Sequence, residues 1–262
     1  YPGASGEIHD LTKLFAQAHT KSALAVAVAD LLALTLITPP GEMGADVVVG
    51  STQRFGVPMG FGGPHAGYLA VREDLERGMP GRLVGVSITA DGSPAYRLTL
   101  QTREQHIRRE RATSNICTAQ VLLAVMAGMY AVYHGPERLK AIASDVWSKA
   151  HRLAQSLRSG GLDVPTREFF DTFEVCGIEA NKVFAAARSK NITLNLIADN
   201  CIGVSVDETT TEQTLLDVLE VFGASSLVAS VDLKLELARS TKYLTHEVFN
   251  SHHPKPFEAW SR

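Results

Sequence analysis

Cysteine is scarce in this sequence, and the apolar residues form no long uninterrupted run. The three cysteines, Cys117, Cys176 and Cys201, lie far apart among the 262 residues and show no CxxC spacing. We therefore expect neither a disulfide framework nor a metal site, and instead three free thiols in a reducing compartment. The most apolar stretch, residues 23–38, contains Asp30 and is too short to cross a bilayer, so we expect no membrane span.

The sequence also lacks a strong excess of either charge. Its formal net charge is -3, which argues against general binding to nucleic acid or to membranes. No signal peptide is visible, although a chain that does not begin with Met leaves room for a lost leader. The opening residues, Tyr1-Pro2-Gly3, read like the exit of a strand, so the sequence is expected to enter a fold midway.

The remaining composition is that of a globular protein, with 45% apolar and 20% charged residues. Helical and strand-like segments alternate through the first hundred residues, which predicts an α/β layer with a parallel-type sheet. A short helical turn ended by Pro39 and Pro40 separates the first two strands, and the stretch around residues 79–87 is predicted to be a loop. The predicted elements are an amphipathic helix at 8–19, a strand buried on both faces at 23–30, and strands at 45–50 and 65–74.

A different pattern follows residue 100. A charged stretch leads into an apolar helix at 118–133, Gly135-Pro136 interrupts it, and an amphipathic helix at 136–159 ends at Gly160-Gly161. Short strands and helices then predict a small α+β unit. The predicted organisation is a partial large α/β domain at 1–134, a connecting helix at 135–160, a small α+β domain at 161–223 and an irregular tail at 224–262.

Polar residues end two of the predicted parallel strands. Asp30 ends one, and Ser51 to Arg54 follow the other, 24 residues later. Ligands of open parallel sheets bind beyond the carboxyl ends of the strands. An Asp and a group on the next strand at this spacing suit pyridoxal phosphate, whose pyridinium nitrogen pairs with a carboxylate. The simpler alternative is that Asp30 caps the helical turn after it.

Arg54 cannot hold such a cofactor covalently. A Schiff base requires an amine that can lose its proton, and a guanidinium stays protonated and delocalised. No lysine replaces it at a predicted strand end, because the lysines fall on helices, before a strand or in the tail.

Several long motifs resemble the amino-terminal half of glycine decarboxylase, the pyridoxal-phosphate P-protein of the glycine cleavage system. They are "GADVVVGSTQRFGVPMGFGGPHAG" from Gly44, "LQTREQHIRRERATSNICTAQ" from Leu100, "VSVDETTT" from Val204 and "YLTHEVFNSHH" from Tyr243. The resemblance covers roughly residues 1–222 and this last motif. It implies an aminotransferase-like (type I pyridoxal-phosphate) fold, in which two homologous halves are fused or split into subunits.

The resemblance also implies roles for this chain. The carboxyl-terminal half of the family carries the cofactor lysine; here Arg54 occupies the corresponding position, Gln53 the neighbouring histidine position, and Asp30 falls near the pyridinium partner. It follows that pyridoxal phosphate is bound by the missing half, that this chain has no catalytic residue of its own, and that Asp30, Gln53 and Arg54 form a degenerate site. Implied partners are the lysine-bearing half, in a dimer or heterotetramer, and the lipoyl arm of H-protein.

By the same resemblance, the whole enzyme decarboxylates glycine and passes the aminomethyl group to the lipoyl group. Its compartment is the mitochondrial matrix in a eukaryote and the cytoplasm in a bacterium. The chain departs from the family after His253, where it reads "PKPFEAW". A non-catalytic scaffold or an inactive truncated fragment therefore stays an alternative, as does a nucleotide-binding enzyme that uses the glycine-rich loop at residues 60–67.

A basic cluster precedes the apolar helix. We expect Arg103, His106, Arg108 and Arg109 to form a docking surface for an acidic partner or a phosphate. The alternative is a solvated helix face on which Glu104 and Glu110 balance the arginines. Among the other candidates, Cys117 is expected to be a small core residue, and His65 to make a local hydrogen bond.

Overall fold

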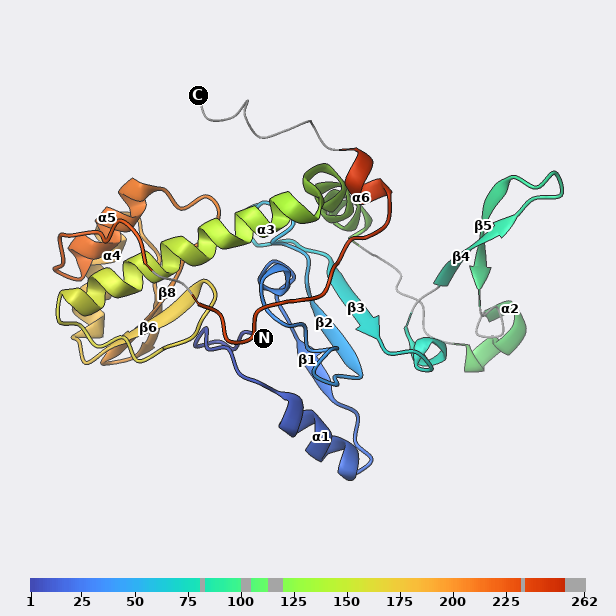
Figure 1. The fold of residues 1–262 in the computed structure, drawn as a ribbon, viewed down its shortest axis with the longest axis horizontal. Coiled ribbons are helices and arrows are strands. Elements are labelled where there is room, and N and C mark those ends of the chain that lie inside the picture. Colours follow the sequence, from blue (N-terminus) through green and yellow to red (C-terminus); the bar gives the residue numbers. More distant parts are fainter. Residues whose placement is uncertain (81–82, 100–104, 113–119, 232–233, 253–262) are drawn as a thin grey trace.

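The computed structural model describes residues 1–80, 83–99, 105–112, 120–231 and 234–252. These residues form an elongated molecule (Figure 1), with a small α+β unit at one end, a projecting hairpin at the other, and the long helix α3 running between them.

A three-stranded sheet forms the centre of the amino-terminal part. Its strands are β1 (Val26–Val28), β2 (Val47–Ser51) and β3 (Gly67–Val71), in the order β1-β2-β3. β1 and β2 are parallel, as predicted, whereas β3 pairs with β2 in the antiparallel direction. Helix α1 (Thr12–Thr20) starts four residues later than predicted, after the Asp10 carboxylate accepts a hydrogen bond from the Thr12 amide.

The prediction that β1 is buried on both faces is wrong. The alanines of the segment, Ala25, Ala27 and Ala29, are buried, but Val26 and Val28 are 58% and 66% exposed. An unbroken apolar run does not separate a strand covered on both sides from one whose second face stays open. Among the described residues, nothing covers this second face.

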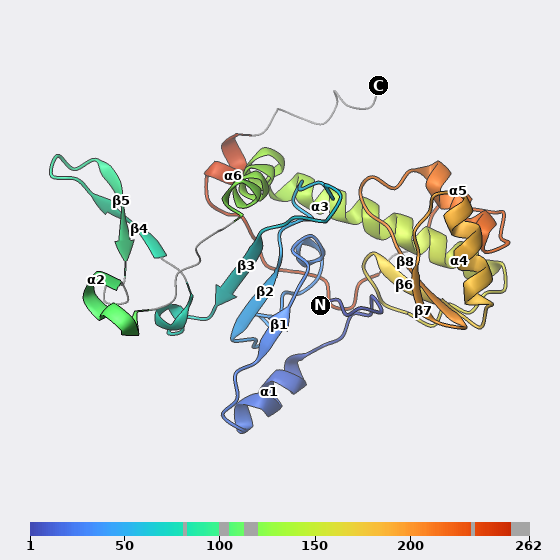
Figure 2. The same ribbon diagram turned by 180° about the vertical axis from the view of Figure 1, so that it is seen from behind.

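The predicted loop at 79–87 is also wrong. Residues Leu83–Ile88 (β4) and Pro94–Thr99 (β5) form an antiparallel hairpin, which is followed by the short helix α2 (Gln105–Arg108). The hairpin projects from the body in both views (Figures 1 and 2), and most of its apolar side chains are exposed. A two-stranded hairpin is marginally stable by itself in water, so this one is suited to packing against something else.

Helix α3 (Val121–Ser159) is interrupted at Gly135, as the sequence predicts. Gly135 has φ 64° and ψ 176°, a conformation that residues with a side chain adopt only at a cost. Pro136 follows as the first residue of the second helical segment, where its missing N–H is not needed. The two segments correspond to the two predicted helices.

The small α+β unit follows the prediction closely. Strands β6 (Thr172–Cys176), β7 (Asn195–Ala198) and β8 (Cys201–Ser205) form an antiparallel sheet in the order β6-β8-β7. Helices α4 (Ala180–Ser189) and α5 (Glu212–Val221) flank it. Its core is continuous with that of the β1–β2 region, and its largest fully buried side chains include Phe169, Phe173, Leu153, Leu157, Ile202 and Leu215.

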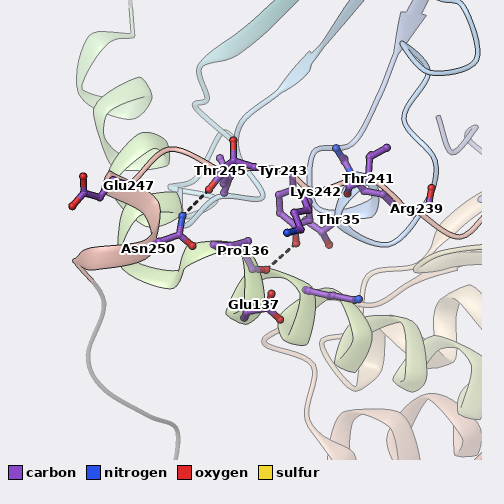
Figure 3. A pocket seen from close by; sticks show the side chains of 13 residues that line it. Thr35, Pro136, Glu137, Arg239, Thr241, Lys242, Tyr243, Thr245, Glu247 and Asn250 are labelled. Atoms are coloured by element: carbon purple, nitrogen blue, oxygen red, sulfur yellow. Dashed lines mark hydrogen bonds between the residues drawn. The ribbon is translucent and has the colours of Figure 1, made fainter.

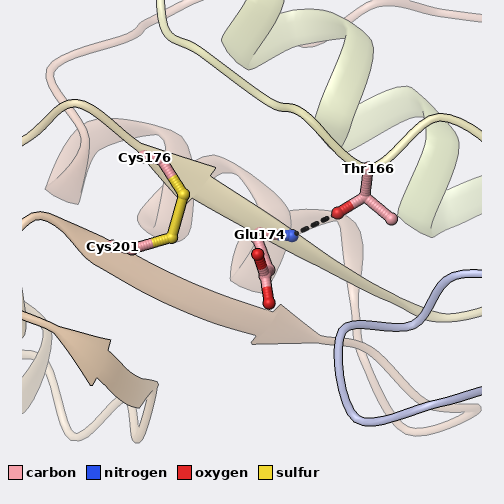
Figure 4. Close-up of a disulfide and its surroundings, with 4 residues drawn as sticks. All are labelled: Thr166, Glu174, Cys176 and Cys201. Carbon is pink, nitrogen blue, oxygen red and sulfur yellow. Dashed lines mark hydrogen bonds between the residues drawn. A yellow bond between two sulfur atoms is a disulfide. The ribbon is translucent and has the colours of Figure 1, made fainter.

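The cysteine prediction is wrong for two of the three residues. Cys176 and Cys201 are directly opposite each other in the β6–β8 pair and are joined by a disulfide, with a Cα–Cα distance of 4.1 Å (Figure 4). β8 pairs directly with β6, although β7 lies between them in the sequence, so the spacing of the cysteines gives no hint of this contact. Cys117 lies outside the described residues.

The tail is irregular, as predicted, but it is not loose up to residue 252. The Thr38 amide donates to the Leu237 carbonyl, the Arg239 amide donates to the Leu36 carbonyl, and the Arg239 guanidinium donates to the Leu34 carbonyl. A short helix, α6 (Val248–Ser251), ends the described part. No helix in the described ranges combines the length and apolarity that a bilayer span requires.

Candidate functional site

The parallel pairing of β1 and β2 brings Asp30 and Arg54 together. Asp30 follows β1, Arg54 follows β2, and an Nη1 atom of Arg54 lies 3.4 Å from an Asp30 carboxylate oxygen. The same nitrogen donates a hydrogen bond of 2.5 Å to Asp171, which immediately precedes β6. Arg54 therefore ties the two sheets together.

Asp30 has the simpler of its two predicted roles, that of a cap for the turn after it. One carboxylate oxygen accepts a hydrogen bond of 2.9 Å from the Leu32 amide and so caps the turn that leads into the 3₁₀ helix η1 (Ala33–Thr35). The other oxygen faces Arg54. The cap fixes the carboxylate in position, and the ion pair then uses the oxygen that the cap leaves available.

Burial is the largest single influence on the pKa of each member of this pair. Burial raises the pKa of Asp30, an effect opposed by Arg54 and reinforced by Asp171. Burial acts to lower the pKa of Arg54, but Asp30 and Asp171 outweigh it, and the pKa of Arg54 lies above its ordinary value. The guanidinium is thus a fixed cation, and it cannot supply the deprotonated amine that a Schiff base requires.

Two guanidinium nitrogens of Arg54, Nε and Nη2, are buried and have no hydrogen-bond partner among the described residues. The guanidinium carbon lies 5.8 Å from the ring centroid of Phe170. Buried donors of this kind normally have a partner. The Arg54 site is therefore incomplete as the described residues stand.

Gln53 does not join Asp30 and Arg54. Its side-chain amide donates to the Met59 sulfur at 3.5 Å, within the glycine-rich loop that follows β2. This loop turns at Gly56, which has φ +76° and where a Cβ atom would lie 2.4 Å from the ring of Tyr130 on α3. His65 makes the expected local contact, since its Nδ1 lies 3.0 Å from the Gly63 carbonyl oxygen.

Asp171 is the member of the site that the sequence reasoning missed. Together with Asp30, Arg54 and Asp207 it lines an open depression of about 450 Å³, to which residues of β8 and the first six residues of the chain also contribute. The sequence holds only a weak signal for Asp171, a charged residue between the apolar pair Phe169-Phe170 and a strand. Its proximity to Arg54 depends on how the two sheets pack.

The residues of this depression do not fit pyridoxal phosphate. In the described part of the chain no lysine lines it, and Asp30, the candidate pyridinium partner, is already paired with Arg54. Three carboxylates against one guanidinium also repel a phosphate group. The described residues that line the depression therefore lack the groups that would hold this cofactor.

A second depression, of about 610 Å³, lies where the tail crosses the second segment of α3 (Figure 3). Its polar groups largely satisfy one another. The Tyr243 hydroxyl donates to the Pro136 carbonyl at 2.8 Å, and the Asn250 amide donates to the Leu244 carbonyl at 3.0 Å. The Arg239 guanidinium lies 4.8 Å from the ring centroid of Tyr243. The Tyr243 contact attaches the tail to the helix, the other two lie within the tail, and none of them indicates chemistry.

The predicted docking cluster is only partly described. Arg103 lies outside the described residues, and His106 lies on α2, where its backbone alone is described. Arg108 and Arg109 are exposed at the end of α2, beyond the hairpin (Figure 1). Their exposure is compatible with a docking surface and equally with a solvated face.

A family model described as "Glycine cleavage system P-protein" matches residues 1–222. The chain belongs to the glycine cleavage system P-protein family. It is 54% identical over 259 residues to a glycine dehydrogenase (decarboxylating) of Stenotrophomonas maltophilia, and the match covers 97% of this chain but 27% of the relative. A glycine dehydrogenase (decarboxylating) of Xanthomonas axonopodis pv. citri is 55% identical over the same length, with 97% and 26% covered. The chain thus spans about a quarter of these bacterial P-proteins.

Solved structures agree with this assignment. A glycine decarboxylase (P-protein) crystal structure in an inhibitor-bound form matches with a TM-score of 0.76 and 38% identity, over 84% of this chain and 52% of that one. A NifS-like protein matches with a TM-score of 0.52 at 14% identity, over 84% and 57%, which speaks for the fold alone. The chain therefore has part of the aminotransferase-like fold that the resemblance implies.

Proposed function

We propose that this chain is a segment of a glycine dehydrogenase (decarboxylating) that supports the active site without anchoring the cofactor. By this proposal the whole enzyme decarboxylates glycine on pyridoxal phosphate and transfers the aminomethyl group to the lipoyl group of H-protein. The observation that carries the proposal is the pairing of Arg54, which the resemblance puts at the anchor position, with Asp30 and Asp171. The catalytic lysine then belongs to another part of the longer protein or to a separate subunit.

The exposed apolar side chains support packing of this chain against another large part of the same enzyme. Val86 and Tyr96 on the hairpin are 77% and 82% exposed, and Met59 and Phe61 in the glycine-rich loop are also exposed. The first segment of α3 adds further exposed apolar residues: Val121, Leu122, Val125 and Met129. So many large apolar side chains left exposed are typical of interfaces. We assign it to contact with the lysine-bearing half, in a dimer or heterotetramer, and we retain the domain division 1–134, 135–160, 161–223 and 224–262.

We further propose that the exposed arginines of the basic cluster face acidic H-protein, and that the enzyme works in a bacterial cytoplasm, since the matched relatives are bacterial. In the longer enzyme, Arg108→Glu with Arg109→Glu should slow the association with H-protein, and the defect should shrink as salt rises, because screening removes electrostatic steering. Unchanged association kinetics at low salt would reject the docking role and leave the solvated face.

The decisive experiment is borohydride reduction of the longer holoenzyme followed by peptide mapping. The reduced cofactor should label a single lysine outside the segment that corresponds to residues 1–262. The isolated chain, incubated with pyridoxal phosphate and reduced, should show no stoichiometric label. A stoichiometric label on one lysine of this segment would overturn the assignment of the cofactor to another part.

A second experiment tests the interface. In the longer enzyme, Val86→Ser combined with Tyr96→Ser should lower activity and weaken the association between the parts, because it removes exposed apolar contacts. The matched control is Leu14→Ser on α1, which is also exposed but lies away from the hairpin. Equal effects of the hairpin variant and the control would count against the hairpin as an interface. If the chain is instead an inactive truncated fragment, neither variant should change any activity.

A further inference from the structure

Three potential metal ligands gather on one face of the small sheet. Cys176 and Cys201 face each other across the β6–β8 pair, and Glu174 lies two residues before Cys176 on the same face of β6 (Figure 4). The two sulfur atoms and a carboxylate oxygen of Glu174 all lie within 4.8 Å of one another. This cluster lies outside the Arg54 site.

The surroundings of Glu174 leave its carboxylate available. Its cross-strand partner is Gly203, beside which the side chains of Asn195 and Ile197 from β7 lie. The backbone amide of Glu174 donates to the Thr166 hydroxyl at 3.0 Å, which fixes the strand, whereas no ion pair of the described residues engages the carboxylate. Glu174 and Cys176 are partly exposed, so an ion can reach them from solvent.

Two thiolates and a carboxylate on paired strands form a ligand set with clear chemical preferences. Thiolate sulfur favours zinc and other soft or borderline ions over magnesium or calcium. Three protein ligands leave the fourth position of a tetrahedral ion to water. The antiparallel ladder holds all three ligand-bearing residues in register, so no loop has to be ordered for the ion to bind.

We propose that Glu174, Cys176 and Cys201 form a binding site for one Zn²⁺ ion when the disulfide is reduced. A thiol reductant supplies two electrons and two protons, which converts the disulfide into two thiols while the reductant itself becomes a disulfide. Zn²⁺ then displaces the two thiol protons and binds both thiolates and the carboxylate. The disulfide and the bound ion are mutually exclusive states of the same pair of cysteines.

The test uses Co²⁺ as a spectroscopic substitute for Zn²⁺. The full chain carrying Cys117→Ser is reduced with a dithiol, freed of reductant without air and titrated with Co²⁺. We expect one Co²⁺ per chain, near-ultraviolet absorbance from thiolate-to-cobalt charge transfer, and displacement by Zn²⁺. Oxidised protein should bind none, and the reduced chain in urea should bind more weakly than the folded chain.

Variants distinguish a metal site made by all three side chains from nonspecific binding of the ion by two neighbouring thiols. Cys176→Ser should abolish the charge-transfer absorbance, and Glu174→Gln should weaken binding on the order of tenfold, in the range seen when a supporting group of a metal site is lost. Glu179→Gln, an exposed acidic residue on the same unit, is the matched control and should have no effect. Circular dichroism of each variant checks that the fold is retained.

Three results would overturn the proposal. They are absence of Co²⁺ binding by the reduced folded chain, binding that persists in Cys176→Ser, and a Glu174→Gln variant that binds as tightly as the parent. A disulfide that can be reduced only after unfolding would overturn it as well.

Discussion

The two segments of α3 lie in opposite environments. After Gly135 the helix buries Leu139, Val146, Leu153 and Leu157 completely against the small sheet and the β1–β2 region. Before Gly135 it leaves Val121, Leu122, Val125 and Met129 more than half exposed. One helix thus contains a stretch whose packing is complete within the chain and a stretch whose packing is not. The hairpin β4–β5 shares the second condition, since Val84, Val86 and Ile88 are also more than half exposed.

The largest expected effect on stability is in the core that packs against the second segment of α3. Phe173 on β6 is fully buried, and Phe173→Ala should lower the free energy of unfolding by about 3–5 kcal/mol through lost burial and a cavity. Urea unfolding followed by circular dichroism measures the loss. A cost near that of a surface substitution would mean that this core is not formed in the isolated chain.

A pH effect should come from His151 in the same core. Its ring stacks on Phe169 with centroids 4.0 Å apart, its Nδ1 lies 2.9 Å from the Trp147 carbonyl oxygen, and burial lowers its pKa to about 4. The fold therefore favours the neutral ring. Its stability contribution is complete above the ordinary pKa of 6.5 and is lost as the pH falls towards about 4.

The size of this contribution is about 2–3 kcal/mol between the two pH limits. His151→Gln should flatten the dependence of unfolding free energy on pH in that window, whatever it does to absolute stability. An unchanged slope in the variant would show that other groups cause the acid sensitivity.

A smaller effect on stability is expected where the loop after β2 contacts the first segment of α3. Gly56→Ala introduces a Cβ atom 2.4 Å from the Tyr130 ring at a residue with φ +76°. The substitution should cost about 1–2 kcal/mol and loosen the first segment of α3 from the glycine-rich loop. Gly62→Ala, in the same loop but with open space around it, is the matched control and should cost clearly less.

The smallest effect on the free energy of unfolding is expected for the exposed hairpin β4–β5. Val86→Ala on the hairpin should change the unfolding free energy of the isolated chain by less than about 0.5 kcal/mol, because Val86 is 77% exposed. The difference in unfolding free energy between Val86→Ala and Phe173→Ala is the most direct test of the difference between the exposed hairpin and the buried core. If Val86→Ala costs as much as a core substitution, the hairpin packs against the body or against another copy in solution.

The sequence predicts those features that depend on neighbouring strands and local signals. The proximity of Asp30 and Arg54 could be predicted because the carboxyl ends of adjacent parallel strands lie at the same edge of a sheet. The break in α3 could be predicted from Gly135-Pro136. The proximity of Asp171 to Arg54 could not be predicted, because it depends on how two sheets pack against each other. The Cys176–Cys201 bond could not be predicted either, because it depends on β8 lying between β6 and β7 in the sheet, an order that the sequence alone does not reveal.

The hairpin was missed for a different reason. Residues 83–88 alternate in the manner of a strand, but the surrounding Gly and Pro residues favour a loop, and no core face in the described part of the chain selects between the two. Where the contacts that stabilise an element lie outside the sequence, local patterns are the only guide to it.

The contacts between the tail and η1 have a consequence for the order of events during synthesis. The Arg239 guanidinium and the Leu34 carbonyl are 205 residues apart, and the Thr38 hydroxyl reaches the Leu237 carbonyl across 199 residues. The segment around η1 therefore emerges from the ribosome long before its final neighbour does. The small α+β unit, whose strands lie within about thirty-five residues of one another, can form first. During that interval the turn after β1 stays open to chaperones or to early pairing with the wrong strand.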